Sequence, residues 1–235
     1  MILTKPDAIP RLAARAINAW RKWRAGLTLF GENISPETPN DLYFAHLSIY
    51  HFFSRFCRDR HVLDLGCGCG YGSAYLRAAG AASVVGVDLD PRNVRYATRR
   101  FAGDGVTFRV ADAQRLPADL GTFDIVVSSN LFEHLTDVNA ALDAISTEFV
   151  LAVPPITDAA SKAANDAIPY HRSNYYVGEW LDLLRKRFAT IDTYAHLAPE
   201  GTALDFTSPF ASRVDPAAFR FPRAEPEELG GSMTA

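Results

Sequence analysis

Glycines and carboxylates stand together where an apolar run meets a helical stretch. Residues 62–65 lead into Gly66, Gly68 and Gly70, and a second apolar run ends on Asp88, which follows Gly66 by 22 positions. Glycine permits a positive φ and lets the backbone approach a ligand closely. A carboxylate at the end of the neighbouring strand can accept two hydrogen bonds from a ribose diol. The pattern therefore predicts a nucleoside-binding site.

Two details of this loop argue against a dinucleotide ligand. Its spacing is G-x-G-x-G rather than G-x-G-x-x-G, and Asp64 lies within the first apolar run. A carboxylate there disfavours a pyrophosphate and favours a ligand that carries an ammonium and a sulfonium group. The chain also contains no Tyr-x-x-x-Lys pair. A nicotinamide-dependent reductase is therefore disfavoured.

The elements that must position these residues alternate along the chain. A helix is expected after Asn40, which is typical of an N-cap, and a loop at 154–175 precedes another helix that Asn174 could cap. Strands alternating with helices predict a parallel sheet covered on both faces. We expect an α/β fold with a doubly wound, mostly parallel seven-stranded sheet. The strands are expected at 62–65, 84–87, 106–110, 123–128, 149–153, 188–196 and 203–208, with helices at 71–80, 91–101 and 137–146.

On these residues the chain resembles the class I S-adenosylmethionine-dependent methyltransferases, which have a Rossmann-like fold. The segment Val62–Gly70 is similar to their first motif, Asp88 to their ribose-binding acid, and residues 110–113 (VADA) to their adenine-contacting motif. Residues 123–128 resemble their fourth strand, and residues 130–135 (NLFEHL) resemble the segment that follows it. The resemblance implies S-adenosylmethionine as the cofactor.

The resemblance extends over about residues 40–200 and implies a role for each matching residue. Asp88 would hold the ribose hydroxyls, and Asp64 would face the cofactor's amino group through water. Leu89 would pack on the adenine, and Asp112 would accept a hydrogen bond from its amine. The implied cofactor-binding residues are Asp64, Gly66, Cys67, Gly68, Asp88, Leu89, Asp112, Ala113 and Asn130.

The acceptor side of the site must supply a proton acceptor if the methyl group goes to oxygen, whereas an amine can arrive unprotonated. His171 lies among aromatic residues in a loop that this fold places over the acceptor, so we expect it to be the general base. His134 and Glu133 are further catalytic candidates, with His134 in a positioning role. Cys67 and Cys69 form a C-x-C pair, but no matching pair lies elsewhere, so no metal is expected there. Assistance of an oxygen acceptor by a divalent metal in place of a general base stays open.

Residues 31–53 loosely resemble bacterial methyltransferases of saccharide and secondary-metabolite assembly. The expected acceptor is therefore a hydroxyl of a small or medium-sized molecule of that kind. N-methylation of an amino sugar or another amine stays open, as does a non-catalytic, cofactor-binding partner protein of the same fold.

The composition excludes several classes of protein. The chain has 235 residues and a net charge of −3, which gives no overall attraction to nucleic acid. No apolar run approaches the roughly 20 residues of a transmembrane helix. With only three cysteines, a cytoplasmic setting is expected.

Three regions are expected along the chain: an N-terminal amphipathic helix and loop (1–40), the methyltransferase domain (41–210) and a loosely ordered tail (211–235). The N-terminal helix carries an apolar stripe on which a second copy of the chain could pack, so a homodimer is one expectation. The stripe consists of Leu12, Ala16, Trp20, Trp23 and Leu27.

Overall fold

A parallel five-stranded sheet forms the centre of the computed structural model, which describes residues 19–24, 26, 34–202, 214–225 and 229. The strand order is β3-β2-β1-β4-β5. All neighbouring pairs are parallel, so the carboxyl ends of the strands lie along one edge. The strands are β1 (His61–Leu65), β2 (Ser83–Asp88), β3 (Val106–Val110), β4 (Ile125–Ser129) and β5 (Glu148–Ala152).

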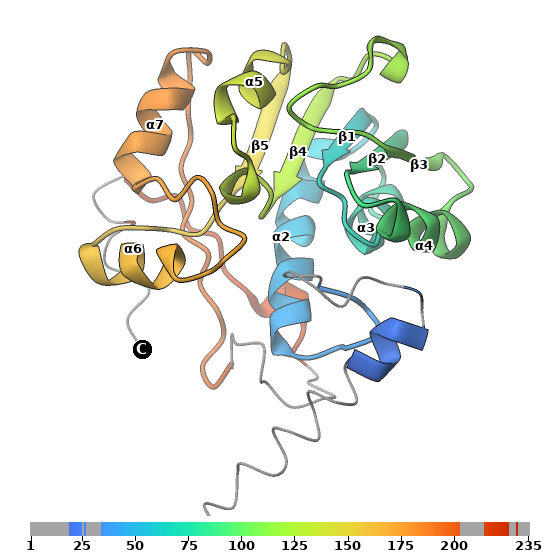
Figure 1. Cartoon of the computed structure of the whole chain (residues 1–235), viewed down its shortest axis with the longest axis horizontal. Coiled ribbons are helices and arrows are strands. Elements are labelled where there is room, and N and C mark those ends of the chain that lie inside the picture. Colours follow the sequence, from blue (N-terminus) through green and yellow to red (C-terminus); the bar gives the residue numbers. More distant parts are fainter. Residues whose placement is uncertain (1–18, 25, 27–33, 203–213, 226–228, 230–235) are drawn as a thin grey trace, which may run out of the picture.

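Helices cover both faces of this sheet. On one face, α2 and α3 share a buried cluster with Val62, Val84 and Ile125. On the other face, α5 and α7 pack on residues such as Leu63 and Val126. Figure 1 shows α3 and α4 near β2 and β3, and α6 and α7 beyond β5. The helices are α2 (Asp41–Cys57), α3 (Tyr71–Ala78), α4 (Pro91–Phe101), α5 (Val138–Asp143), α6 (Ala159–Asp166) and α7 (Val177–Arg185), with single 3₁₀ turns η1 (Ala118–Leu120), η2 (Phe132–His134) and η3 (Pro216–Ala218).

Local sequence signals explain where several helices begin. The Asn40 side chain accepts a hydrogen bond from the Tyr43 amide at 2.9 Å, as expected of an N-cap. Helix α6 lies in the stretch predicted as a loop. It begins with a reciprocal capping box between Asp158 and Ser161. The prediction that Asn174 caps the next helix is wrong. Helix α7 begins at Val177, and the Asn174 side chain contacts His171 and Asp166 instead.

The predicted parallel α/β architecture is confirmed, but the predicted seven strands are not found, since the sheet of the described residues has five. In place of a strand over 188–196, the chain forms isolated antiparallel bridges between Tyr194 and Arg223 and between Leu197 and Arg220. These residues pair with the C-terminal segment and so satisfy their backbone groups away from the sheet. The expected strand at 203–208 lies outside the described residues.

The C-terminal segment 214–225 packs on the domain, although the sequence indicated a loosely ordered tail from 211 onward. Phe219 is buried, and the Phe221 ring stacks on Phe52 of α2 at a centroid distance of 4.4 Å. The His196 ring lies against Phe221 on the same side. Apolar burial therefore holds a segment whose composition is rich in proline and charge.

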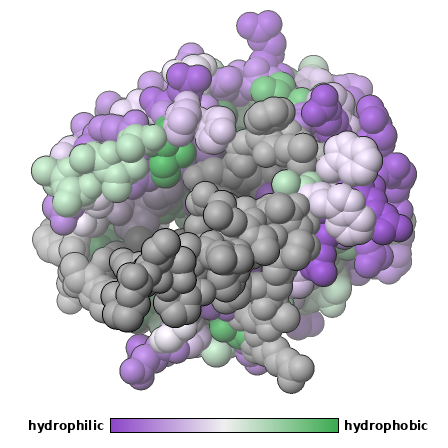
Figure 2. Space-filling view, turned by 60° about the horizontal axis from the view of Figure 1, so that its bottom comes forward, coloured by the Kyte–Doolittle hydropathy of each residue, from purple (hydrophilic) through white to green (hydrophobic). Residues whose placement is uncertain are grey.

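On the described part of the face in Figure 2, hydrophilic residues predominate.

Candidate active site

The glycine loop joins β1 to α3 and lies against the end of β2. The amides of Gly66 and Cys67 both donate to the Val87 carbonyl at 2.9 Å. A Cβ at Gly66 would approach the Leu131 side chain to 2.8 Å, so only glycine fits beside the segment after β4. At Gly68, φ is +54° and a Cβ would meet no atom within 4 Å. The loop is thus tight against the protein at Gly66 and open at Gly68.

Asp88 connects the end of β2 to this loop. Its Oδ2 accepts a hydrogen bond from the Gly68 amide at 2.9 Å, and its Oδ1 accepts from the Asp90 amide at 2.9 Å. Burial raises the pKa of the Asp88 carboxyl, and these two hydrogen bonds oppose the rise. The next side chain, Leu89, is 68% exposed despite being apolar. A carboxylate beside an exposed apolar surface is an arrangement that can hold a ribose and a base.

Asp64 lies wholly within the protein, between α2 and α3. Its two carboxylate oxygens accept hydrogen bonds from the Tyr50 hydroxyl (3.2 Å) and the Ser73 hydroxyl (2.6 Å). Burial raises the pKa of this carboxyl to about 7, although both hydroxyls favour the charged form. The sequence did not single out Tyr50 or Ser73, because neither belongs to a motif and only the packing of two helices brings them to Asp64.

The remaining predicted cofactor residues lie along the same edge of the sheet. Asp112, just after β3, accepts from the amide and the side chain of Gln114 through its Oδ1. Ala113 is buried beside it. Asn130, just after β4, has a φ of +53°, which is uncommon for a residue other than glycine. Cys67 and Cys69 are both buried within the loop, and burial raises the pKa of each thiol.

The three predicted catalytic residues converge. Glu133, His134 and His171 each place one potential ligand atom within 4.8 Å of those of the other two. The two imidazole rings meet edge-on, with centroids 5.0 Å apart. Glu133 is 2% exposed. The group lies after β4, next to Leu131, which contacts the glycine loop.

Backbone hydrogen bonds hold the His171 loop onto the turn after β4. The amides of Arg172 and Ser173 donate to the Glu133 carbonyl at 2.7 and 3.0 Å. The Ser173 hydroxyl donates to the Leu135 carbonyl at 2.7 Å. The position of His171 relative to Glu133 is therefore set by backbone contacts as well as by its own side chain.

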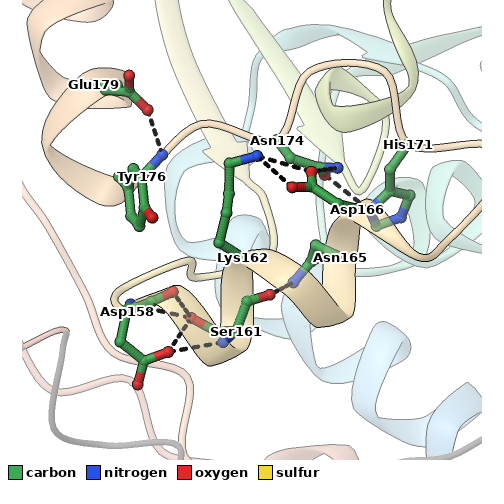
Figure 3. Close-up of polar contacts among 9 residues, drawn as sticks. All are labelled: Asp158, Ser161, Lys162, Asn165, Asp166, His171, Asn174, Tyr176 and Glu179. Carbon is green, nitrogen blue, oxygen red and sulfur yellow. Dashed lines mark hydrogen bonds and ion pairs between the residues drawn. The ribbon is translucent and has the colours of Figure 1, made fainter.

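A chain of polar side chains behind His171 was missed by the sequence analysis (Figure 3). Asn174 contacts the His171 ring at 3.1 Å and donates to Asp166 at 2.8 Å. Asp166 in turn pairs with Lys162 one helical turn earlier. The i,i+4 spacing of Lys162 and Asp166 is the signal that could have revealed helix α6 and this network.

The edge of the sheet that carries the glycine loop and the strand-end carboxylate belongs to a domain of the class I methyltransferase type. Residues 62–147 match the family model described as a methyltransferase domain. A solved S-adenosylmethionine-dependent methyltransferase from Thermotoga maritima has the same fold, with a TM-score of 0.56 and 18% identity, over 76% of this chain and 87% of that one. The predictions of the class and of S-adenosylmethionine as its cofactor are confirmed.

Relatives with assigned names are similar over part of their length. A Mycobacterium tuberculosis protein named "Probable S-adenosylmethionine-dependent methyltransferase" is 36% identical over 115 residues, which are 48% of this chain and 41% of that protein. A phthiotriol/phenolphthiotriol dimycocerosates methyltransferase of Mycobacterium leprae is 34% identical over 87 residues, 36% of this chain and 32% of that protein. A tRNA U34 carboxymethyltransferase of Alcanivorax borkumensis is 36% identical over 127 residues, 53% of this chain and 38% of that protein.

The chain therefore spans less than half the length of these relatives. In the part of the chain that the structure describes, no helix is long and apolar enough to cross a membrane.

Proposed function

We propose that this chain transfers a methyl group from S-adenosylmethionine to a hydroxyl group of a small or medium-sized acceptor. The observation that carries the proposal is the convergence of Glu133, His134 and His171 at the sheet edge that also carries the glycine loop. A protein that only bound the cofactor would have no need of groups able to take a proton beside it.

The cofactor supplies an activated methyl group on a sulfonium. The residues that would hold it are those of the open loop and the adjoining strand end. Asp88 offers carboxylate oxygens to a ribose, Leu89 offers an exposed apolar surface to a base, and the absence of a side chain at Gly68 leaves space beside both. Asp112, Ala113 and Asn130 complete the proposed set around this edge. Asp64 is fully buried and hydrogen-bonded to Tyr50 and Ser73, so it offers the cofactor no exposed oxygen.

On the acceptor side, the reaction must form an oxygen–carbon bond while the carbon–sulfur bond breaks, and the hydroxyl proton must leave. An alcohol is almost wholly protonated at neutral pH, so a neighbouring group must promote that loss. The cluster of Glu133, His134 and His171 is the proposed place where the acceptor gives up its proton. Tyr170 adjoins it and is 44% exposed, so its ring is available to stack on an acceptor.

Among hydroxyl acceptors, we propose a saccharide or secondary metabolite. The exposed Tyr170 and Tyr176 suit the flat faces of such molecules. The relatives' names include phthiotriol dimycocerosates and tRNA U34, so the acceptor differs within the similar proteins. The net charge of −3 favours an acceptor other than nucleic acid.

The cofactor assignment is tested by calorimetry with S-adenosylhomocysteine, the demethylated product. Asp88→Ala should weaken binding by about 1.5–3 kcal/mol, the range for a hydrogen bond to a charged group. Asp119→Ala is the matched control, because this exposed carboxylate pairs with Arg109 rather than with an amide of the loop. Equal affinity in the wild type and Asp88→Ala would contradict the assignment.

The acceptor assignment is tested with methyl-labelled S-adenosylmethionine and panels of saccharides and amino sugars. Label should appear on hydroxyl oxygen, and His171→Ala should lower kcat by roughly 10²–10⁴ while affinity for S-adenosylhomocysteine stays within a few-fold. Label found only on amines would refute the hydroxyl proposal. Binding of S-adenosylhomocysteine with no transfer to any acceptor would favour the non-catalytic alternative.

A further inference from the structure

We propose that Glu133, His134 and His171 bind a divalent first-row transition-metal ion, with Zn²⁺ as the reference ion. Their potential ligand atoms lie within 4.8 Å of one another, a separation that a shared ion can span. Two imidazoles and one carboxylate are a donor set that such ions use, with further coordination positions left open. His171 is far from Glu133 and His134 in the sequence, where the only metal-like spacing considered at the glycine loop is the C-x-C pair of Cys67 and Cys69.

The orientation of the two histidine rings is the second observation. The Nδ1 atom of His134 lies 3.2 Å from the Tyr170 carbonyl oxygen. A carbonyl oxygen can only accept, so Nδ1 must carry the proton and donate it. In the neutral ring, the lone pair is then on Nε2. The hydrogen bond thus selects the tautomer that a metal ion requires.

The same tautomer is selected at His171, through two further residues (Figure 3). The Asn174 amide nitrogen donates to Asp166, which accepts because it is an ionised carboxylate paired with Lys162. The other end of the amide, Oδ1, therefore faces Nδ1 of His171 at 3.1 Å. That oxygen accepts, so Nδ1 of His171 donates and Nε2 carries the lone pair.

Metal-ligating histidines nearly always donate their other ring N–H to a carbonyl or carboxylate oxygen, which fixes the ring and raises its basicity. Both histidines of this cluster do so, the first directly to the backbone and the second to an amide that is itself held by an ion pair. Glu133 adds a buried carboxyl group, whose oxygens can serve as ligands to a cation. Mg²⁺ and Ca²⁺ prefer all-oxygen sites, so the two imidazoles favour a transition metal.

The chemical role of the ion rests on the methyl transfer proposed above. An acceptor hydroxyl bound at an open position of the ion would lose its proton more readily, as water bound to Zn²⁺ does. The proton would leave to solvent, and the resulting oxygen would attack the methyl carbon as the carbon–sulfur bond breaks.

The test is a titration of the metal-stripped chain with Zn²⁺, in which binding is measured by calorimetry. One ion should bind per chain. Asn174→Ala should weaken Zn²⁺ binding by about 10–100-fold, the usual effect of losing an outer partner of a ligand, and His171→Ala and Glu133→Gln should weaken it further. His61→Ala is the control and should bind as the wild type does, since this exposed residue contacts Ser83 at the other end of β1.

Unchanged Zn²⁺ affinity in His171→Ala, or no binding to the wild type, would overturn the proposal and leave the cluster as a metal-free proton acceptor. Equal affinity for Mg²⁺ would overturn the assignment to transition metals. Binding of S-adenosylhomocysteine is measured on the same metal-stripped samples. If a sample binds S-adenosylhomocysteine but not Zn²⁺, only the proposed metal site is refuted. If the wild type does not bind S-adenosylhomocysteine, the proposed function is refuted. Binding of S-adenosylhomocysteine by a variant also shows that this variant is folded.

Discussion

At the scale of single residues, Gly68 is where the loop leaves open space, which we propose that the cofactor occupies. A Cβ there meets nothing within 4 Å, and φ is +54°. Gly68→Ala should therefore abolish binding of S-adenosylhomocysteine in calorimetry, because the added methyl group would occupy the space of the ligand.

Gly201→Ala is the matched control for that variant, since Gly201 has a φ of +78° and is equally open. Both substitutions carry a cost of about 1–2 kcal/mol for a left-handed residue with a side chain. Only Gly68→Ala should lose the ligand. Normal binding by Gly68→Ala would show that the loop is not the cofactor site.

The raised pKa of Asp64 predicts how the free energy of unfolding depends on pH. Its pKa is raised from 3.8 to about 7 in the folded chain, so the folded state retains a proton that the unfolded state has released between these values. The contribution of Asp64 to the free energy of unfolding is therefore fully present below about pH 4 and declines as pH rises toward 7. Asparagine does not titrate, so Asp64→Asn should gain stability relative to the wild type across this window.

Urea unfolding of both proteins at pH values from 4 to 8 measures this difference. A difference between wild type and Asp64→Asn that stays constant over the whole range would contradict the raised pKa. Other titrating groups, such as the half-buried His46, are present in both proteins and cancel in the comparison.

At the scale of elements, the segment 214–225 is predicted to contribute to the stability of helix α2. Phe219 is 4% exposed and its ring lies 5.1 Å from that of His196. Phe219→Ala should lower the free energy of unfolding by about 3–5 kcal/mol, since it leaves a cavity in place of a buried ring. Arg220→Ala, an exposed neighbour, should change it by less than about 0.5 kcal/mol. Similar values for the two variants in chemical denaturation would show that the segment is not part of the cooperative fold.

At the scale of the whole molecule, the N-terminal region is predicted to serve the acceptor side or a dimer rather than the cofactor. Residues 19–24 are helical, and Trp20, Arg21 and Arg24 line a groove together with Tyr96 and Arg99. Deleting residues 1–30 should leave affinity for S-adenosylhomocysteine within a few-fold but change acceptor turnover or oligomeric state. Calorimetry, turnover assays and sedimentation measure these effects. If turnover, oligomeric state and stability all match the full chain, the prediction fails.

The sequence by itself determined how the central strands and helices alternate along the chain, and it determined the class of cofactor. Strand ends, glycines and caps are local signals: the apolar run 62–65 leads directly into the glycine loop, and Asn40 caps its own helix. Asp88 could be proposed as the ribose ligand because the end of one strand lies next to the start of the loop in a parallel sheet of this kind.

Only the tertiary structure decided how distant residues meet. His171 and Glu133 are 38 positions apart, and the backbone bonds that join their segments leave no periodic pattern in the sequence. The same holds for Tyr50 and Ser73 on Asp64, and for the pairing of 193–197 with 220–224 in place of the strand expected at 188–196. Such contacts depend on which surfaces remain after the core has formed, and burial of apolar area there outweighs local composition.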